Sequence, residues 1–119
     1  MIYSPAFVYK WTHIPSGKWY IGKHTGSIDD GYICSSHLVK PHIEEYITEW
    51  NREILATGTT DQMTLTEIMY LRKLDAVNNP QSLNQTNGHG KIVFKELPEP
   101  QHPKQETKKT IRQILMEQE

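Results

Sequence analysis

The sequence predicts a compact α/β (α+β) domain, in which a small, mostly antiparallel sheet of three strands is flanked by helices and followed by a short C-terminal tail helix. Three observations lead to this prediction. Two segments rich in aromatic and β-branched residues enclose a turn, two later segments have apolar residues at helical spacing, and an Asn- and Gly-rich stretch follows them. With 119 residues, the chain has room for one core and at most a short appendage.

A hairpin is expected first, with strands at residues 6–11 and 18–23. Residues 12–17 are expected to turn, because Pro15 cannot donate to a strand ladder and Gly17 can adopt positive φ. Each strand carries one tyrosine, so the hairpin places two phenols near each other. On periodicity alone, these two side chains could equally be ordinary hairpin aromatics.

The next elements follow a loop at residues 24–36, which is rich in Gly, Asp and Ser. A helix is expected at residues 40–50, where apolar side chains recur at helical spacing and Pro41 falls in the first turn. Residues 51–56 form a candidate third strand. It is closed by the turn-forming sequence at residues 57–60.

A second helix is expected at residues 61–77, because Thr60 or Asp61 can cap it and no glycine or proline interrupts it. Its apolar stripe begins at Met63 and contains one carboxylate, that of Glu67. A charge desolvated among apolar side chains costs several kcal/mol unless it is paired or binds a metal. Glu67 is therefore expected either to hold a metal ion or to neutralise a buried Lys or Arg.

The rest of the chain is less regular. Residues 83–90 are too rich in Asn and Gly for a helix or strand and should return the chain to the core, and residues 91–97 are expected as a short extra strand or a packed strip. The folded domain is therefore assigned to residues 1–96. Residues 97–119 are expected to form a proline-rich linker and a helical tail that either docks or frays.

The formal net charge is −1, which counts against a tight, non-specific DNA binder. Basic side chains nevertheless gather in the first forty residues, which favours a local basic face or, alternatively, scattered and solvated lysines. These residues are Lys10, Lys18, Lys23, His24, His37 and Lys40, beside only Asp29 and Asp30.

The composition predicts an intracellular, cytoplasmic protein with no membrane partner. No stretch approaches ~18 uninterrupted apolar residues, and the N-terminus lacks the basic-then-apolar pattern of a secretory signal. The single cysteine, Cys34, cannot form an internal disulfide, in agreement with a reducing compartment. Six histidines invite a zinc hypothesis, yet no tight ligand pair supports it. The candidates for it are His24, His37, His42 and His89.

Together these parts resemble the GIY-YIG nuclease superfamily over about residues 7–90, and look closest to its small phage-encoded, homing-type endonucleases. The tyrosine of the first motif corresponds to Tyr9, with Phe7 and Val8 in place of glycine and isoleucine. The second motif is intact as Tyr20-Ile21-Gly22. Further similar strings are Tyr9-Lys10-Trp11-Thr12, Tyr20-Ile21-Gly22-Lys23-His24 and Asp29-Asp30-Gly31-Tyr32.

The resemblance implies a divalent-metal-dependent DNA endonuclease, phage-encoded and acting in a bacterial host, that hydrolyses phosphodiester bonds in double-stranded DNA with Mg²⁺ (or Mn²⁺). Glu67 corresponds to the metal ligand of the family. Tyr9 corresponds to the catalytic base, although a phenol with a reference pKa of about 10 needs a neighbouring lysine or metal-bound water to lower that value. Tyr20 would orient water or phosphate, and Asn84, the last member of the catalytic set, would order the loop beside the site.

One landmark of the family is missing, namely the arginine that stabilises charge on the scissile phosphate. Its register falls on Asp30, and Lys23 is the best substitute, although lysine lacks the bidentate fork of arginine. His24 is a weaker member of the catalytic set, and His37 and Lys40 are expected as phosphate contacts. The missing arginine motivates an alternative, a catalytically impaired nucleic-acid-binding module that keeps the fold.

Overall fold

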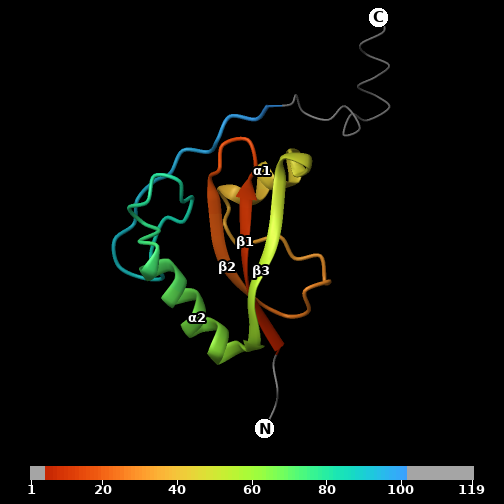
Figure 1. Ribbon diagram of the computed structural model, residues 1–119, viewed down its shortest axis with the longest axis vertical. Coiled ribbons are helices and arrows are strands. Elements are labelled where there is room, and N and C mark those ends of the chain that lie inside the picture. Colours follow the sequence, from red (N-terminus) through yellow and green to blue (C-terminus); the bar gives the residue numbers. More distant parts are fainter. Residues whose placement is uncertain (1–4, 102–119) are drawn as a thin grey trace, which may run out of the picture.

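The fold is built on a three-stranded antiparallel sheet with the strand order β2-β1-β3 (Figure 1). A computed structural model describes residues 5–101. The expected α+β architecture, a small antiparallel sheet with flanking helices, is confirmed over these residues. In chain order the elements are β1 (Pro5–His13), β2 (Trp19–Thr25), α1 (Val39–Glu45), a 3-10 helix η1 (Ile47–Glu49), β3 (Trp50–Thr59) and α2 (Thr60–Lys73).

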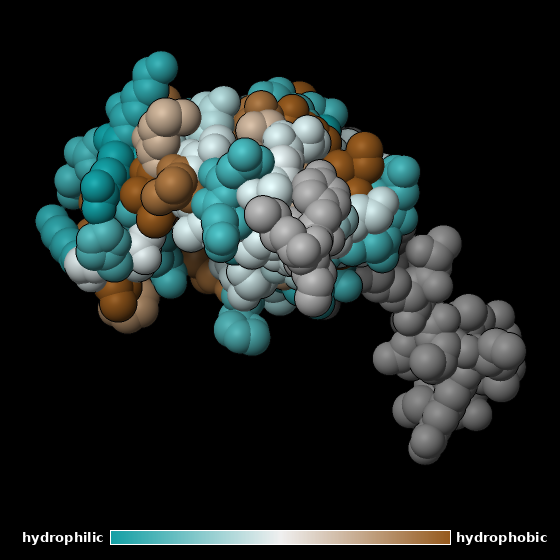
Figure 2. Space-filling view, turned by 90° about the horizontal axis from the view of Figure 1, so that it is seen from below, coloured by the Kyte–Doolittle hydropathy of each residue, from teal (hydrophilic) through white to brown (hydrophobic). Residues whose placement is uncertain are grey.

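The central strand, β1, is buried on both of its faces. Because successive side chains of a strand point to opposite faces, Phe7 and Tyr9 pack on the same side as Ile43 of α1, whereas Val8 packs on the side of Met63 in α2. The sheet is therefore the middle layer between the two helices. No helix within residues 5–101 is long and apolar enough to cross a bilayer. On the face that Figure 2 shows, apolar residues appear in separate groups among polar ones.

The first helix is shorter than the expected residues 40–50. It ends at Glu45, because Tyr46 has φ −124° and ψ 43°, outside the helical region. Trp50, which the spacing assigns to this helix, instead begins β3, where it pairs with His13 and is 6% exposed. This burial against a distant strand overrides the local helical spacing.

The third strand is longer than the expected residues 51–56 and includes most of the predicted turn. Thr57 pairs with Phe7 of β1, and Gly58 continues the strand. A Cβ at Gly58 would come within 2.6 Å of Gln62 Oε1, so the glycine allows the first turn of α2 to pack closely over the strand. The glycine serves a close approach here rather than a turn.

Helix α2 begins with Thr60, and its N-cap is Thr59 rather than the expected Thr60 or Asp61. The Thr59 hydroxyl accepts from the Gln62 N–H at 3.2 Å, while Gln62 Oε1 accepts from the Thr59 N–H at 3.0 Å. This is a capping box, which satisfies two backbone donors that the helix itself leaves without acceptors.

The same helix ends at Lys73, short of the expected Val77. The chain reverses at Asp75, which has a positive φ of 45°. Val77 is buried beyond the helix end, and its N–H donates to Asn87 Oδ1 at 2.7 Å. Leu74, which lies seven residues after Glu67 and would continue the apolar stripe of a longer helix, is 38% exposed. Tertiary contacts of the return loop, rather than helical periodicity, thus fix this part of the chain.

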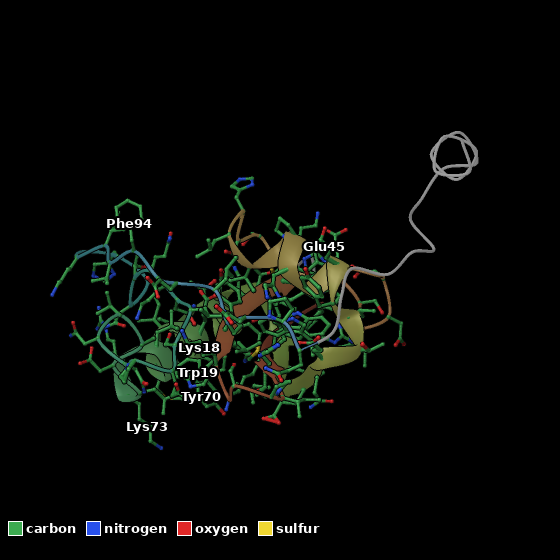
Figure 3. All side chains as sticks on the ribbon, turned by 90° about the horizontal axis from the view of Figure 1, so that it is seen from above. Lys18, Trp19, Glu45, Tyr70, Lys73 and Phe94 are labelled. Atoms are coloured by element: carbon green, nitrogen blue, oxygen red, sulfur yellow. The ribbon has the colours of Figure 1, made fainter. Side chains whose placement is uncertain are left out.

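Residues 91–101 form neither helix nor strand. Ile92 and Phe94 are 66% and 90% exposed, and Figure 3 shows Phe94 projecting outward, so the expected extra strand or packed strip does not form with these side chains. The segment returns to the molecule at Leu97, which packs against the core on the α1 side. The expected tail helix at residues 104–119 lies outside the described residues.

Candidate active site

A cavity of about 620 Å³ lies beside β2 and is bounded by β2, α2 and the loops at residues 35–38 and 83–88. It brings together four of the predicted site residues, which are Tyr20, His37, Glu67 and Asn84. The other four do not line it, namely Tyr9, Lys23, His24 and Lys40. The cavity therefore separates the predicted set into residues that line it and residues that lie elsewhere.

Glu67 lies on the buried side of α2, four residues from Met63 and four from Leu71, which are both buried. Its half-buried carboxylate lies near the backbone N–H of Lys23 in β2, which favours the ionised form. Burial raises the pKa of Glu67 above its ordinary value of 4.5, and the charge and N–H of Lys23 oppose this effect. Among residues 5–101, no lysine or arginine forms a salt bridge with Glu67.

Tyr20 lies half-buried between the cavity and the core on the α1 side. Its hydroxyl lies beside the side chain of Ser35. Burial, with smaller contributions from Cys34 and Glu67, raises the pKa of Tyr20 to about 12. The phenol therefore stays protonated at neutral pH and is suited to donating a hydrogen bond rather than to accepting a proton.

Asn84 holds the return loop against β2. Its Oδ1 accepts from the Ile21 N–H at 2.9 Å, and its Nδ2 donates to the Ile21 carbonyl at 2.7 Å. Just before it, the Leu83 N–H donates to the Trp19 carbonyl, and the Trp19 N–H donates to the Gln81 carbonyl. The segment thus runs parallel beside β2. The side-chain amide of Asn84 makes the two hydrogen bonds with Ile21 that a further peptide group of this segment would make. Its role in this geometry is to order the wall of the cavity.

Tyr9 lies one strand away from the cavity and is 1% exposed. Within residues 5–101, its hydroxyl oxygen has no hydrogen-bond partner. The phenol lies over Gly22, the residue paired with it across the hairpin, where a Cβ would come close to the Tyr9 hydroxyl. Burial, with a smaller contribution from Tyr20, raises the pKa of Tyr9 far above its ordinary value. In this conformation Tyr9 is not poised to act as a base.

Lys23 and His24 both have partners outside the cavity. Lys23 Nζ donates to Thr64 Oγ1 at 2.9 Å, which holds the ammonium beside α2. His24 Nε2 lies 2.7 Å from Asp30 Oδ2, and its ring stacks on Tyr32 with a centroid distance of 3.6 Å. Asp30, which occupies the register of the family arginine, therefore pairs with His24.

The remaining cationic candidates are at the surface. His37 is exposed and lines the cavity, and Lys40 is exposed in the first turn of α1. No arginine is part of the cavity lining. Arg52 of β3 instead donates from Nη2 to the Ile28 carbonyl at 2.8 Å. A ligand in the cavity can thus contact a cationic candidate, His37, at the rim.

A second polar group, the buried histidine cluster (His13, His42, Glu49 and Trp50), lies elsewhere on the α1 side and was not foreseen from the sequence. His13 Nε2 lies 2.7 Å from Glu49 Oε1, and Trp50 Nε1 donates to His42 Nδ1 at 3.1 Å. Both oxygens of Glu49 also accept from the Gln101 N–H at 3.1 Å. No local pattern indicates this cluster, because His13 and Glu49 are 36 residues apart.

The donor set fits a hard cation that keeps most of its waters. Within the described part of the chain, no three His, Cys, Asp or Glu side chains are grouped to hold a metal ion. Glu67 alone presents a carboxylate at the cavity, and Mg²⁺ is commonly bound through one or two carboxylates while it retains several waters. A tetrahedral zinc site would require three or four protein ligands.

Comparison of the chain with models of protein families, with curated proteins and with solved structures gave no match. The resemblance to GIY-YIG nucleases therefore stays a prediction based on the motifs of the sequence.

Proposed function

We propose that the protein is a divalent-metal-dependent DNA endonuclease of the GIY-YIG class, which hydrolyses phosphodiester bonds in double-stranded DNA. One observation carries the proposal: the cavity joins Glu67, Tyr20 and Asn84, which come from three separate parts of the chain. A half-buried carboxylate with a raised pKa and no salt bridge within residues 5–101 is costly to the fold, and binding of a cation would offset that cost.

In this proposal, Glu67 holds Mg²⁺ or Mn²⁺, which would polarise the phosphate and favour ionisation of a bound water. The protonated Tyr20 phenol, which lies beside Ser35, would donate a hydrogen bond that orients the attacking water or a phosphate oxygen. Asn84 fixes the cavity wall through Ile21 and need not touch the substrate. These roles divide the site into one ligand, one orienting group and one positioning residue.

The cations around the cavity act at different distances. The Lys23 backbone N–H orients the Glu67 carboxylate, while its ammonium, bonded to Thr64, adds positive potential beside it. His37 at the rim, and Lys40 one helical turn further along the chain, are the phosphate contacts of the proposal. With these groups, the protein would hold the DNA backbone without a bidentate arginine, so each phosphate contact should be looser and binding should weaken as salt rises.

Two observations favour the alternative, a catalytically impaired nucleic-acid-binding module. Tyr9, the base implied by the resemblance, is buried, and no arginine lines the cavity. A protein with these features could bind DNA without cutting it. The two functions differ in their dependence on the metal, because only the enzyme needs the ion for turnover.

The test is relaxation of supercoiled plasmid by the full chain at low salt, with Mg²⁺ or with chelator, beside a gel-shift assay of the same DNA. The endonuclease produces nicked circles with Mg²⁺ and none in chelator. Retained DNA binding without nicking under either Mg²⁺ or Mn²⁺ would establish the binding module instead. Absence of both nicking and binding would reject both functions.

A further inference from the structure

The Tyr9 hydroxyl is the most unusual polar group on the α1 side of the sheet. It is fully buried and, within residues 5–101, has no hydrogen-bond partner. A buried hydroxyl without a partner is unfavourable, and nearly all buried polar groups in folded proteins avoid it. Such a hydroxyl would be more stable in a second conformation in which it has a hydrogen-bond partner.

The cover over Tyr9 comes from residues 26–38, which contain neither helix nor strand and are called the lid below. The Tyr32 ring meets the Tyr9 ring edge-on at a centroid distance of 6.2 Å. Cys34, which is 3% exposed, belongs to the same core cluster. The lid continues to His37 at the rim of the cavity. One segment thus covers Tyr9 and also forms part of the cavity wall.

Tyr9 is close to the cavity despite this cover. Its ring centroid is 6.4 Å from that of Tyr20, which lines the cavity. Gly22 leaves open the space over which the phenol lies, so no side chain of β2 separates the two tyrosines at that position. Removal of the lid would therefore expose Tyr9 to the same space as Tyr20.

The lid is held by the packing of Cys34, Tyr32 and Ile33 against the core and by a small set of polar contacts near the surface. His24 of β2 pairs with Asp30 at 2.7 Å and stacks on Tyr32, and the side chains of the pair are 20% and 35% exposed. Asp30 also accepts from the Tyr32 N–H at 3.0 Å. A Cβ at Gly26 would lie 2.5 Å from Asp30 Oδ2, so the glycine leaves room for the pair. Exposed pairs of this kind contribute little stability, so their release is inexpensive.

Three further contacts join the lid backbone to the sheet. Arg52 donates to the Ile28 carbonyl at 2.8 Å, the Trp11 indole N–H donates to the Ile33 carbonyl at 2.9 Å, and the Gly26 N–H donates to the Pro5 carbonyl at 2.8 Å. These are single bonds rather than a strand ladder. The lid is therefore attached at separate points, and the His24–Asp30 pair is the one whose histidine also stacks on the Tyr32 ring.

We propose that residues 26–38 are a closed lid over Tyr9, latched by the His24–Asp30 pair, and that opening of the lid admits Tyr9 to the cavity beside Tyr20. The regulation of the site by the lid depends on the proposed nuclease function, whereas the existence of the lid does not depend on that function. In the open state, the Tyr9 hydroxyl gains water or phosphate as a partner. The closed state keeps the phenol out of the proposed reaction.

The experiment uses Cys34, the single thiol of the chain, as a reporter inside the lid. Burial raises the pKa of this thiol, so in the closed state it should react with Ellman's reagent at least about tenfold more slowly than in denaturant. We expect Asp30→Ala to accelerate the native reaction about tenfold. The matched control, Asp29→Ala, removes a neighbouring exposed carboxylate and should stay within about twofold of the wild-type rate.

A second measurement separates opening from unfolding. Hydrogen exchange of the Val8 amide, in the central strand, should keep its wild-type protection in Asp30→Ala while the thiol reacts faster. An unchanged thiol rate in Asp30→Ala would overturn the lid, as would equal acceleration by Asp29→Ala or loss of Val8 protection in step with the thiol rate.

The thiol assay contains neither DNA nor metal, so its outcome is independent of the nuclease proposal. If the lid opens in Asp30→Ala but the wild type never nicks plasmid, the lid stands and the proposed function fails. If the wild type nicks plasmid but the thiol rate does not respond, the nuclease stands and the lid fails.

Discussion

Two glutamates of this molecule have opposite environments. Glu49 is 2% exposed, lies 2.7 Å from His13 Nε2 and accepts from the Gln101 N–H. Glu67 is half-buried at a cavity, where a backbone N–H of Lys23 supports it and no salt bridge with residues 5–101 forms. The first carboxylate is deeply buried and well supplied with donors. The second keeps lone pairs that face open space.

The different environments of the two carboxylates indicate different roles for Glu49 and Glu67. A buried carboxylate with good donors fixes three segments of chain in place, and nothing remains for a ligand to satisfy. A half-desolvated carboxylate at a cavity destabilises the folded chain unless a ligand binds it. The buried histidine cluster is thus a structural element, and the Glu67 cavity is the place where the proposed cation and phosphate would bind.

The largest expected effect is on stability at the first glutamate. Glu49→Ala removes the acceptor of His13 and Gln101, and should lower the free energy of unfolding by about 3 kcal/mol or more. Urea denaturation measures this change. Glu53→Ala, at an exposed position of β3, is the control and should stay within about 0.5 kcal/mol of the wild type. Equal effects of the two variants would contradict the structural role of Glu49.

A smaller loss is expected at Asn84. Asn84→Ala leaves the buried N–H and carbonyl of Ile21 without their side-chain partners, which should cost about 2–3 kcal/mol. Asn84→Asp keeps the acceptor for the Ile21 N–H but sets a buried carboxylate against the Ile21 carbonyl, so it should lose at least as much stability in a urea titration that compares the two variants. A wild-type unfolding midpoint for Asn84→Ala would show that the return loop does not depend on this amide.

Opposite signs are expected for the two tyrosines. Tyr9→Phe removes a hydroxyl without a described partner and should raise the free energy of unfolding by about 1 kcal/mol. Tyr20→Phe removes a hydroxyl that lies beside Ser35 at the cavity and should lower it by less than about 1 kcal/mol. Thermal unfolding of both variants checks the prediction. Destabilisation by Tyr9→Phe would mean that the phenol has a partner in the closed state after all.

The smallest effect is the pH dependence that Glu67 confers. Its pKa is higher in the folded than in the unfolded chain, so its contribution favours folding at pH below about 4.5 and is lost as pH rises through the folded pKa. Glu67→Gln should therefore melt slightly higher than the wild type at pH 8, with the gap closing by about pH 4. The opposite trend, a variant that melts lower at pH 8, would indicate a paired Glu67.

The local parts of the fold were predictable from the sequence. The hairpin of β1 and β2 follows from strand-forming residues around Pro15 and Gly17, and the three-stranded α+β class follows from the order of the segments. Glu67 was identifiable because helical spacing from Met63 places its carboxylate on an apolar side. In each case the information lies within a few neighbouring residues.

The remaining features depend on contacts between distant segments. Trp50 leaves the expected helix because it pairs with His13, and β3 extends through Gly58 because β1 offers a partner there. The burial of Tyr9 depends on Tyr32, which belongs to a loop without regular structure. Sequence periodicity does not encode such pairings, so neither the histidine cluster nor the cover over Tyr9 could be foreseen.

The most direct test of the contrast between the two glutamates is Mg²⁺-dependent plasmid nicking by the wild type, Glu67→Gln and Glu53→Gln, each confirmed as folded by circular dichroism. The account predicts a loss on the order of 100-fold or more for Glu67→Gln, because the metal ligand is removed, and a wild-type rate for Glu53→Gln. Nicking by Glu67→Gln at the wild-type rate would contradict the assignment of the cavity as the catalytic centre.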